Sequence, residues 1–261
     1  MLELYHWEPN TSHLKCLIAL KEKGLTFTSH YVDILDFKTP RKYPALNDEA
    51  RFSMEGEGPI LVNAGAVITD SFFANLYLDD VFPEKPLQPD DAVGRWRIQA
   101  LSRFLGEVLA PAASTLGCHT YLAPELKKRD GRDIDAFISK LSSLEMRLAW
   151  TAAAKNDYSK DLLDDSRRKV GVGVKRIEGM LATSPWLVGD RFSIADIEAF
   201  ALTNGLTKLT PDLVGKSASP RVVDWLERMR MRPGVKAALA MSKTGKSDEC
   251  YAPGPEHSRW G

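Results

Sequence analysis

An acidic residue and a hydroxyl, Asp70 and Ser71, stand together where an apolar helix is predicted to begin. A helix N-terminus presents backbone N–H groups without intrahelical partners and the positive end of the helix dipole, so it attracts a carboxylate. The Ser71 hydroxyl can bond to that carboxylate, and the Asp70 carboxylate can receive an ammonium group. The pair therefore predicts a site for the end group of an α-amino acid, although plain helix capping is the commoner role of Asp-Ser.

A second set of reactive side chains, Thr11, Ser12 and His13, stands where the first helix is predicted to begin. A hydroxyl or imidazole N–H beside a helix N-terminus stabilises a thiolate by a charge-assisted hydrogen bond and lowers the thiol pKa. We expect Ser12 to fill this role ahead of its neighbours, because the preceding loop must turn before the helix exposes its first donors. For the two hydroxyls, helix capping alone is an equally good interpretation, and for His13 the alternative is a solvated side chain.

A predicted hairpin leads into the helix at Asp70. Two apolar runs, residues 60–62 and 66–69, are separated by the turn residues 63–65, which is typical of two paired strands. Pro59 stands where the first strand begins, a position that tolerates proline, and it holds Gly58 in an extended conformation. The hairpin therefore places the edge of a β-sheet beside the start of the helix at Asp70.

The residues before the hairpin predict a βαβ unit. A strand at residues 2–5 is followed by a helix that Thr11 or Ser12 caps and Gly24 ends, and then by a second strand in TFTSHYVDI. The whole first half thus has the order βαβ then ββα. Residues 34 to 57 between the two units are expected to be a mobile, charged connection.

The second half of the chain has a helical apolar period. Three prolines within seven residues predict a semi-rigid linker. Beyond them, the apolar spacing over residues 96–109, 134–150 and 170–181 predicts a helical bundle. Ser193 and Asp196 have capping-box separation, which supports folding and not catalysis. The expected division is residues 1–83, a linker at 84–90, a helical domain at 91–240 and a tail at 241–261.

Composition excludes several classes of protein. The 261 residues are 44% hydrophobic, which suffices for two domains with sizeable cores. With 35 basic and 35 acidic residues, the chain lacks the broad basic field that nucleic-acid binding needs. The chain starts without a secretion signal, so we expect a cytoplasmic protein. It has no apolar run of about 20 residues, so we expect no membrane-spanning helix. Three scattered cysteines favour reduced thiols over disulfides or a zinc site.

The run from Gly58 to Ser71 resembles the glutathione transferase superfamily. In that family a cis-proline follows the residue whose backbone holds the cysteinyl part of glutathione, which implies Gly58 and Pro59. An acidic residue and a serine at the next helix start grip the γ-glutamyl group, which implies Asp70 and Ser71. Ser53, in the run ahead of Pro59, is a further glutathione-binding candidate. By the same resemblance, Thr11, Ser12 or His13 would stabilise the glutathione thiolate.

The segment from Gly189 to Asp196, G-D-x-F-S-x-A-D, is similar to the hallmark of the family's helical domain. The resemblance thus covers residues 1 to about 240. It implies an α/β plus all-α protein in which a thioredoxin-like domain precedes a helical bundle. It also implies a homodimer, or a heterodimer with a related chain, and Phe72 and Phe73 are candidate interface residues.

Several runs, among them SIADIEAFALTNGL, resemble the bacterial glutathione-dependent β-etherases, in particular the LigF-type branch. That resemblance implies thiolate attack on the ether-bearing carbon beside a ketone in a hydrophobic aromatic substrate, and departure of a phenol. No metal is implied. A general glutathione transferase, or a glutathione-binding subunit with little activity alone, is the alternative. The expected wall of the aromatic pocket consists of Trp7, Ser114, Cys118, His119 and Tyr121.

Overall fold

The computed structural model describes residues 1–46, 58–141 and 143–249. Within them, a four-stranded sheet has the order β2-β1-β3-β4. Strand β1 pairs in parallel with β2 and antiparallel with β3, and β3 pairs antiparallel with β4, which confirms the predicted hairpin. The strands are β1 (Leu2–His6), β2 (Thr28–Tyr31), β3 (Ile60–Asn63) and β4 (Ala66–Thr69).

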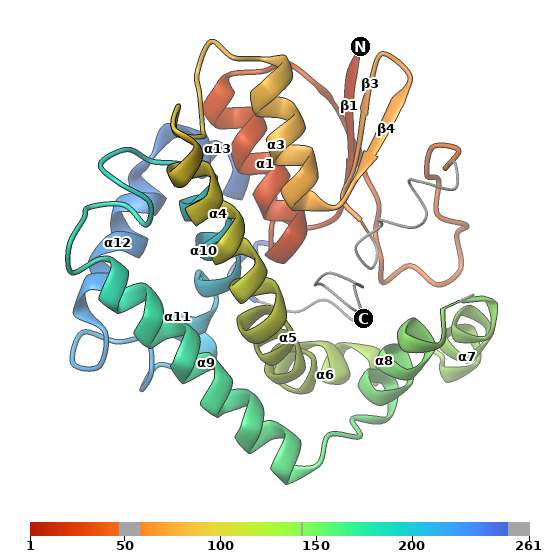
Figure 1. The fold of residues 1–261 in the computed structure, drawn as a ribbon. Coiled ribbons are helices and arrows are strands. Elements are labelled where there is room, and N and C mark those ends of the chain that lie inside the picture. The colour runs from red at the N-terminus through yellow and green to blue at the C-terminus, as the bar shows by residue number, and fades with distance from the viewer. Residues whose placement is uncertain (47–57, 142, 250–261) are drawn as a thin grey trace.

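Two helices, α1 (Thr11–Lys23) and α3 (Ser71–Val81), lie side by side against the sheet (Figure 1). Helix α1 ends as predicted, because Gly24 adopts a left-handed conformation with φ of 71°. Its predicted start was wrong: the N-cap is Asn10, not Thr11 or Ser12. The Asn10 carbonyl already accepts the first helical bond, from the Leu14 N–H at 3.1 Å, so the two hydroxyls belong to the first turn.

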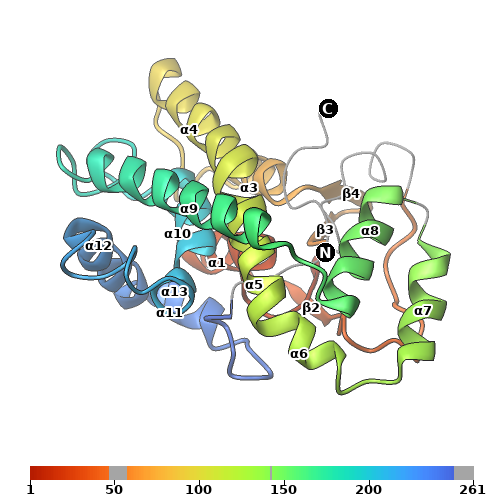
Figure 2. The same cartoon turned by 90° about the horizontal axis from the view of Figure 1, so that it is seen from below.

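The described elements that follow the sheet and α3 are all helical, as predicted. The helices at residues 194–203 and 233–239 pack against α1 on the side away from the sheet, whereas those at residues 131–140 and 144–155 lie near the loop after β2 (Figures 1 and 2). Prolines at the starts of α5 and α6 are tolerated there because the first N–H groups of a helix need no intrahelical partner. None of these described helices is both long and apolar enough to cross a membrane. The elements are α4 (Ala92–Phe104), the π-helical turn η1 (Leu105–Leu109), α5 (Ala110–Gly117), the π-helical turn η2 (Cys118–Leu122), α6 (Ala123–Leu126), α7 (Gly131–Lys140), α8 (Leu144–Lys155), α9 (Lys160–Met180), α10 (Ile194–Thr203), α11 (Leu206–Leu209), α12 (Pro220–Met231) and α13 (Pro233–Leu239).

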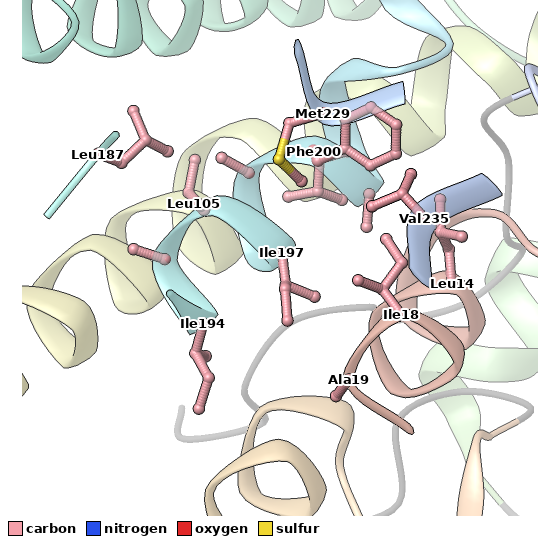
Figure 3. Close-up of a cluster of buried hydrophobic side chains, with 14 of the residues drawn as sticks. Leu14, Ile18, Ala19, Leu105, Leu187, Ile194, Ile197, Phe200, Met229 and Val235 are labelled. Carbon is pink, nitrogen blue, oxygen red and sulfur yellow. The ribbon is translucent and has the colours of Figure 1, made fainter. Parts of the chain in front are cut away.

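Helix α10 lies at the centre of the main hydrophobic core, and all of its residues are buried. Ile197 and Phe200 extend from it into this core, to which α1 contributes Leu14 and Ile18 and α13 contributes Val235 (Figure 3). A helix whose residues are all buried has to be enclosed by other elements. One continuous core therefore joins the sheet-bearing half to the helical half.

The apolar period over residues 134–150 does not form one helix. Helix α7 ends before Leu141, whose backbone is extended with ψ of 127°. The Ser143 hydroxyl then caps α8 by accepting a hydrogen bond from the Met146 N–H at 3.3 Å. A new capping residue thus starts a second helix inside the periodic run.

A second hydrophobic cluster joins the loop after β2 to the helices from η2 to α8. Ile34 and Leu35 are buried in it, so the expectation of a mobile, charged connection was wrong for this part. The carboxylate of Asp33 accepts a hydrogen bond from the Leu35 N–H at 2.9 Å. A charged side chain thus fixes the local backbone while its apolar neighbours turn inward. Residues 47–57 of the expected connection lie outside the described residues.

Candidate active site

The two ends of the hairpin have the backbone features that the sequence and the family resemblance suggested. The Gly58–Pro59 peptide is cis. Asp70 has a positive φ of 66°, and its Oδ1 accepts hydrogen bonds from the N–H groups of Phe72 and Phe73 at 2.9 and 3.2 Å. Asp70 is thus the cap of α3, and Ser71 is the first helical residue, fully buried. The cap satisfies two of the orphan donors of this helix.

The start of α1 meets the loop before Pro59. The Ser12 hydroxyl donates a hydrogen bond to the Gly58 carbonyl at 3.4 Å, whereas the Thr11 hydroxyl points back to the Asn10 side chain at 3.3 Å. Of the two hydroxyls, only that of Ser12 therefore has a described bond to the backbone beside the cis-proline.

His13 is a buried residue, so the interpretation as a solvated side chain was wrong. Its Nδ1 accepts a hydrogen bond from the Trp7 N–H at 3.3 Å. Burial, with a smaller contribution from His6, lowers the pKa of His13 from 6.5 to about 3. Its ring packs against Gly58, where an added Cβ would lie 3.4 Å from Cε1 and where φ is +117°. The neutral imidazole thus contacts both the loop after β1 and the residue that precedes Pro59. Glycine suits position 58 because of the positive φ there.

Helix α1 links the two parts of the site. The Cys16 thiol, fully buried, lies 3.8 Å from the Ser71 carbonyl, one turn along from Ser12. The structure therefore brings together Ser12, His13 and Gly58 at one end of α1 and connects them to Ser71 through Cys16. Cys16 packs in the core, as expected. Ser53 lies outside the described residues.

Buried polar groups behind α3 were missed by sequence reasoning. The Lys15 ammonium pairs with the Glu198 carboxylate at 3.1 Å, and the Ser102 hydroxyl donates to the same carboxylate oxygen at 3.1 Å. Burial raises the pKa of Glu198, Lys15 opposes that rise, and the charge of Asp70 adds to it. Within the described residues, Glu198 Oε1 and the amide of Asn75 have no hydrogen-bond partner. The sequence signal that could have revealed this buried group is the charged residue Glu198 within an otherwise largely apolar helix.

The residues expected to line an aromatic pocket gather around the second hydrophobic cluster. Trp7 and Cys118 are buried in it and Tyr121 packs against it. The Ser114 hydroxyl lies 3.9 Å from the Cys118 sulfur, and His119 Nδ1 lies 2.9 Å from the Asn156 side-chain oxygen. The five residues thus share one region of the molecule. Their contact with a substrate stays a prediction.

Tyr158 is an aromatic residue of this region that the sequence did not single out. Its ring meets the His119 ring edge-on, with centroids 5.9 Å apart. Burial and the neighbouring Cys118 thiol raise the pKa of the Tyr158 phenol, which stays protonated at neutral pH. The loop between α8 and α9 places Tyr158 beside His119, and no local sequence pattern predicts this contact.

The comparisons with known proteins agree with this arrangement. Residues 141–233 match the family model "Glutathione S-transferase, C-terminal domain". The chain is 32% identical over 249 residues to Protein LigF of Sphingobium sp. strain SYK-6, covering 93% of this chain and 94% of that protein. The crystal structure of Beta-etherase LigF from the same strain superposes with a TM-score of 0.82 at 31% identity, covering 92% of this chain and 99% of that one.

More distant relatives share the fold. A glutathione S-transferase of Methylobacterium radiotolerans, solved in complex with glutathione sulfonate, is 24% identical with a TM-score of 0.62 and covers 96% of this chain and 95% of its own. The thioredoxin-like sheet, the helical second half and the near-full-length similarity to LigF lead to one conclusion. The chain belongs to the glutathione transferase family and is an enzyme of that family.

Proposed function

We propose that the protein is a glutathione-dependent β-etherase, which cleaves the β-aryl ether bond of aromatic ketones such as those derived from lignin. The similarity to Beta-etherase LigF over almost the whole of both chains carries this proposal. The aromatic side chains of the second cluster, among them Trp7 and Tyr121, would suit an aromatic second substrate if it bound beside them.

Glutathione would bind along the line from Asp70 to Ser12. The γ-glutamyl ammonium would meet the Asp70 carboxylate, and its carboxylate would meet the hydroxyl and N–H of Ser71. The backbone of Gly58, before the cis-Pro59, would hold the cysteinyl part, which brings the sulfur to the Ser12 hydroxyl. The Ser12 bond to the Gly58 carbonyl is long, at 3.4 Å, so the hydroxyl can turn to a thiolate at little cost.

The proposed reaction is a nucleophilic substitution at carbon. The glutathione thiolate attacks the carbon that bears the ether oxygen, next to the ketone, and forms a carbon–sulfur bond. The carbon–oxygen bond breaks and its electron pair leaves with the phenolate, which then takes a proton from water. The products are a glutathione thioether and a phenol. The protein holds both reactants and keeps the sulfur ionised.

The experiment that tests the proposal is a product assay. Purified protein is incubated with glutathione and a β-aryl ether ketone, and chromatography follows the phenol and the thioether in equal amounts. Conjugation of a general electrophile without phenol release from the ether would favour the general transferase. Glutathione binding without either product would favour a subunit with little activity alone.

Replacing Ser71 with alanine is expected to weaken glutathione binding. The hydroxyl would bond to a charged carboxylate, and the loss of such a bond costs about 1.5–3 kcal/mol, or roughly tenfold or more in affinity. Titration calorimetry measures the dissociation constant. Ser193→Ala, at the start of a different helix, α10, serves as the control. An unchanged constant for Ser71→Ala would remove Ser71 from the proposed site.

Replacing Ser12 with alanine is expected to raise the pKa of bound glutathione and to lower turnover about tenfold at neutral pH. The loss is partial because backbone N–H groups at the same helix start would share the thiolate and the ketone already activates the carbon. Thiolate absorbance measured against pH gives the pKa. If it moves in Thr11→Ala or His13→Ala instead, the role belongs to that neighbour.

Pairing of two chains stays a prediction, whether with a second copy or with a related chain. Helices α3 and α4 expose large apolar side chains, namely Phe73, Val81, Val93 and Trp96. Phe72, the other candidate, instead packs partly against the main core. An exposed apolar surface of this kind is typical of an interface.

A further inference from the structure

A cavity of about 770 Å³ lies beside β2, between this edge strand and the loop that follows it, and we call it the β2 cavity. Ligand sites commonly enclose about 300–1,000 Å³. Its described lining contains no residue of the proposed glutathione site. We propose that the β2 cavity binds an aromatic carboxylate, as a site separate from the glutathione site and independent of the proposed reaction. The lining residues that carry this proposal are Tyr5, His30, Tyr31, Lys42 and Lys243.

One wall of the β2 cavity is a pair of stacked rings. Tyr5 of β1 and His30 of β2 are partners in the parallel ladder, so their side chains leave the sheet on the same face. Leu4 points into the main core, which places the two rings on the face of the sheet opposite α1 and α3. The ring centroids are 4.3 Å apart with an interplanar angle of 14°, and His30 Nε2 lies 2.7 Å from the Glu3 carboxylate. Such a fixed aromatic surface suits packing of another ring.

Two ammonium groups at the β2 cavity are available to an anion. Lys42 and Lys243 both line it, and within the described residues neither ammonium makes an ion pair. The Lys243 ammonium lies 3.9 Å from the centre of the Tyr31 ring, so a cation is held beside an aromatic face. Cations next to aromatic rings fit a ligand that carries a negative charge on a ring.

The two carboxylates of the β2 cavity are bonded to the backbone of the loop after β2. Asp33 accepts a hydrogen bond from the Leu35 N–H at 2.9 Å. Asp36 accepts hydrogen bonds from the N–H groups of Lys38 and Thr39 at 3.0 and 3.1 Å. The described lining also contains three Lys and Arg side chains, which exceed these two acids. The charge of the cavity therefore favours an anion.

Arg41 favours a carboxylate over a phosphate ester as that anion. Its guanidinium donates a hydrogen bond to the Ile34 carbonyl at 2.6 Å and lies 4.3 Å from the centre of the Phe137 ring. The planar fork that would bind a phosphate by two parallel hydrogen bonds is thus engaged with the loop and with α7. The two lysines, which act as point charges, remain for a single carboxylate.

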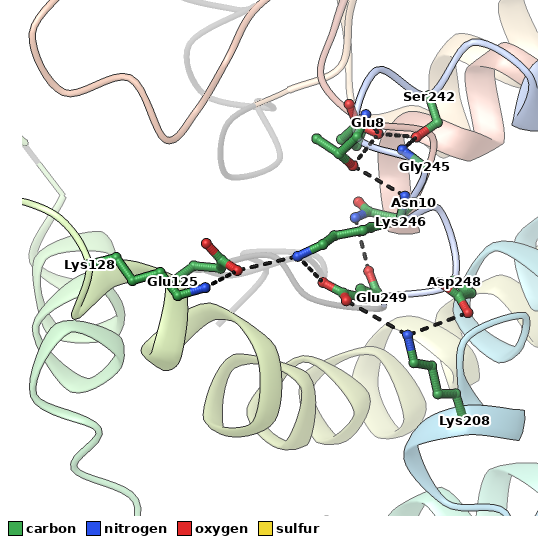
Figure 4. Close-up of polar contacts among 11 residues, drawn as sticks. Glu8, Asn10, Glu125, Lys128, Lys208, Ser242, Gly245, Lys246, Asp248 and Glu249 are labelled. Atoms are coloured by element: carbon green, nitrogen blue, oxygen red, sulfur yellow. Dashed lines mark hydrogen bonds and ion pairs between the residues drawn. The ribbon is translucent and has the colours of Figure 1, made fainter.

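Both sides of the β2 cavity are fixed by contacts within the protein. Ile34 and Leu35 anchor the loop in the second hydrophobic cluster. On the other side, the Lys243 N–H donates a hydrogen bond to the buried Glu8 carboxylate at 3.0 Å. The neighbouring Ser242 hydroxyl bonds to the same carboxylate (Figure 4). A site that is already formed loses less conformational entropy when a ligand binds.

The first test uses 2-naphthoate as the probe, titrated calorimetrically into the full-length protein without glutathione. We expect saturable binding. Two analogues are each expected to bind at least about tenfold more weakly: 2-naphthamide, which keeps the rings but not the charge, and cyclohexanecarboxylate, which keeps the charge but not an aromatic ring. No binding of 2-naphthoate, or equal binding of either analogue, would overturn the proposal.

The second test places the probe in the β2 cavity. Lys42→Ala and Lys243→Ala are each expected to weaken 2-naphthoate binding at least about fivefold, and because both side chains are exposed these variants keep the fold. His30→Ala, which removes half of the stacked wall, should have a similar effect. Lys38→Ala is the matched control, since Lys38 belongs to the same loop but pairs with Asp133 at 3.9 Å outside the described lining. Unchanged affinity in the first three variants would place the probe elsewhere and overturn the proposal.

The third test separates this site from the glutathione site. Saturating glutathione is expected to change the affinity for 2-naphthoate by less than about twofold, because separate sites without coupling bind independently. Loss of 2-naphthoate binding in glutathione would show that both ligands share one site. Displacement by inorganic phosphate at a comparable concentration would show a site for anions in general. Either result would overturn the proposal, and neither depends on which reaction the enzyme catalyses.

Discussion

Asp196→Ala is expected to lower the free energy of unfolding by about 3–5 kcal/mol, since it removes a buried charged acceptor and leaves its donors without partners. The Asp196 carboxylate accepts hydrogen bonds from the N–H groups of Leu187 and Ser193, both at 3.1 Å, and from the Trp225 indole N–H at 2.9 Å. Burial raises its pKa to about 6, against the effect of these donors. The carboxylate is therefore mostly ionised at neutral pH.

Urea unfolding followed by far-ultraviolet circular dichroism measures this change. Trp225→Phe is the partner variant, because it removes one donor and keeps the carboxylate, so its loss should be clearly smaller. A loss below about 1 kcal/mol for Asp196→Ala would mean that water replaces the carboxylate readily. The capping box would then contribute little to the stability of the helical half.

His13 is expected to make the protein about 2 kcal/mol less stable at pH 5 than at pH 7. The pKa of this buried imidazole is lowered from 6.5 to about 3. As the pH falls below 6.5, the unfolded chain binds a proton at His13 and the folded chain does not, so stability decreases down to about pH 3. Above that window the contribution of His13 is constant.

The measurement compares wild type with His13→Asn at both pH values. The Asn side-chain oxygen can replace Nδ1 as the acceptor for the Trp7 N–H, and the other titrating groups are common to both proteins. The drop between pH 7 and pH 5 should be about 2 kcal/mol smaller in the variant. An NMR titration gives an independent check: a His13 ring signal that shifts near pH 6.5 would contradict the prediction.

The sequence predicted those parts of the site that depend on neighbours along the chain. The hairpin, the Asp70 cap and the left-handed Gly24 each follow from residue types within a few positions. The Ser193–Asp196 pair was found in the same way. In each case a single turn or helix cap satisfies the hydrogen-bonding groups of the local backbone. A pattern of neighbouring residues is therefore enough to predict the structure.

Other parts depend on contacts between distant residues and gave no local signal. Glu8 lies more than 230 positions from Thr244, to which it bonds. Its charge alone predicts a side chain that is exposed to solvent. Ile34 and Leu35 stand between two aspartates, so this run was interpreted as a polar connection. In the structure they are buried in the cluster that residues of α7 and α8 also form. The break before Ser143 was missed because the apolar period continues across it.

The position of α1 bears on whether the two domains named from the sequence are independent folding units. One side of α1 packs with the sheet and α3, and Leu14 and Ile18 share a core with α10 and α13. The Glu22 carboxylate also makes two hydrogen bonds to Arg232 beside α13. A chain cut in the linker would expose to water the apolar surface of α1 that packs against α10 and α13. The first half of the chain therefore depends on contacts near the end of the chain for part of its stability, and we expect the two halves to unfold as one cooperative unit.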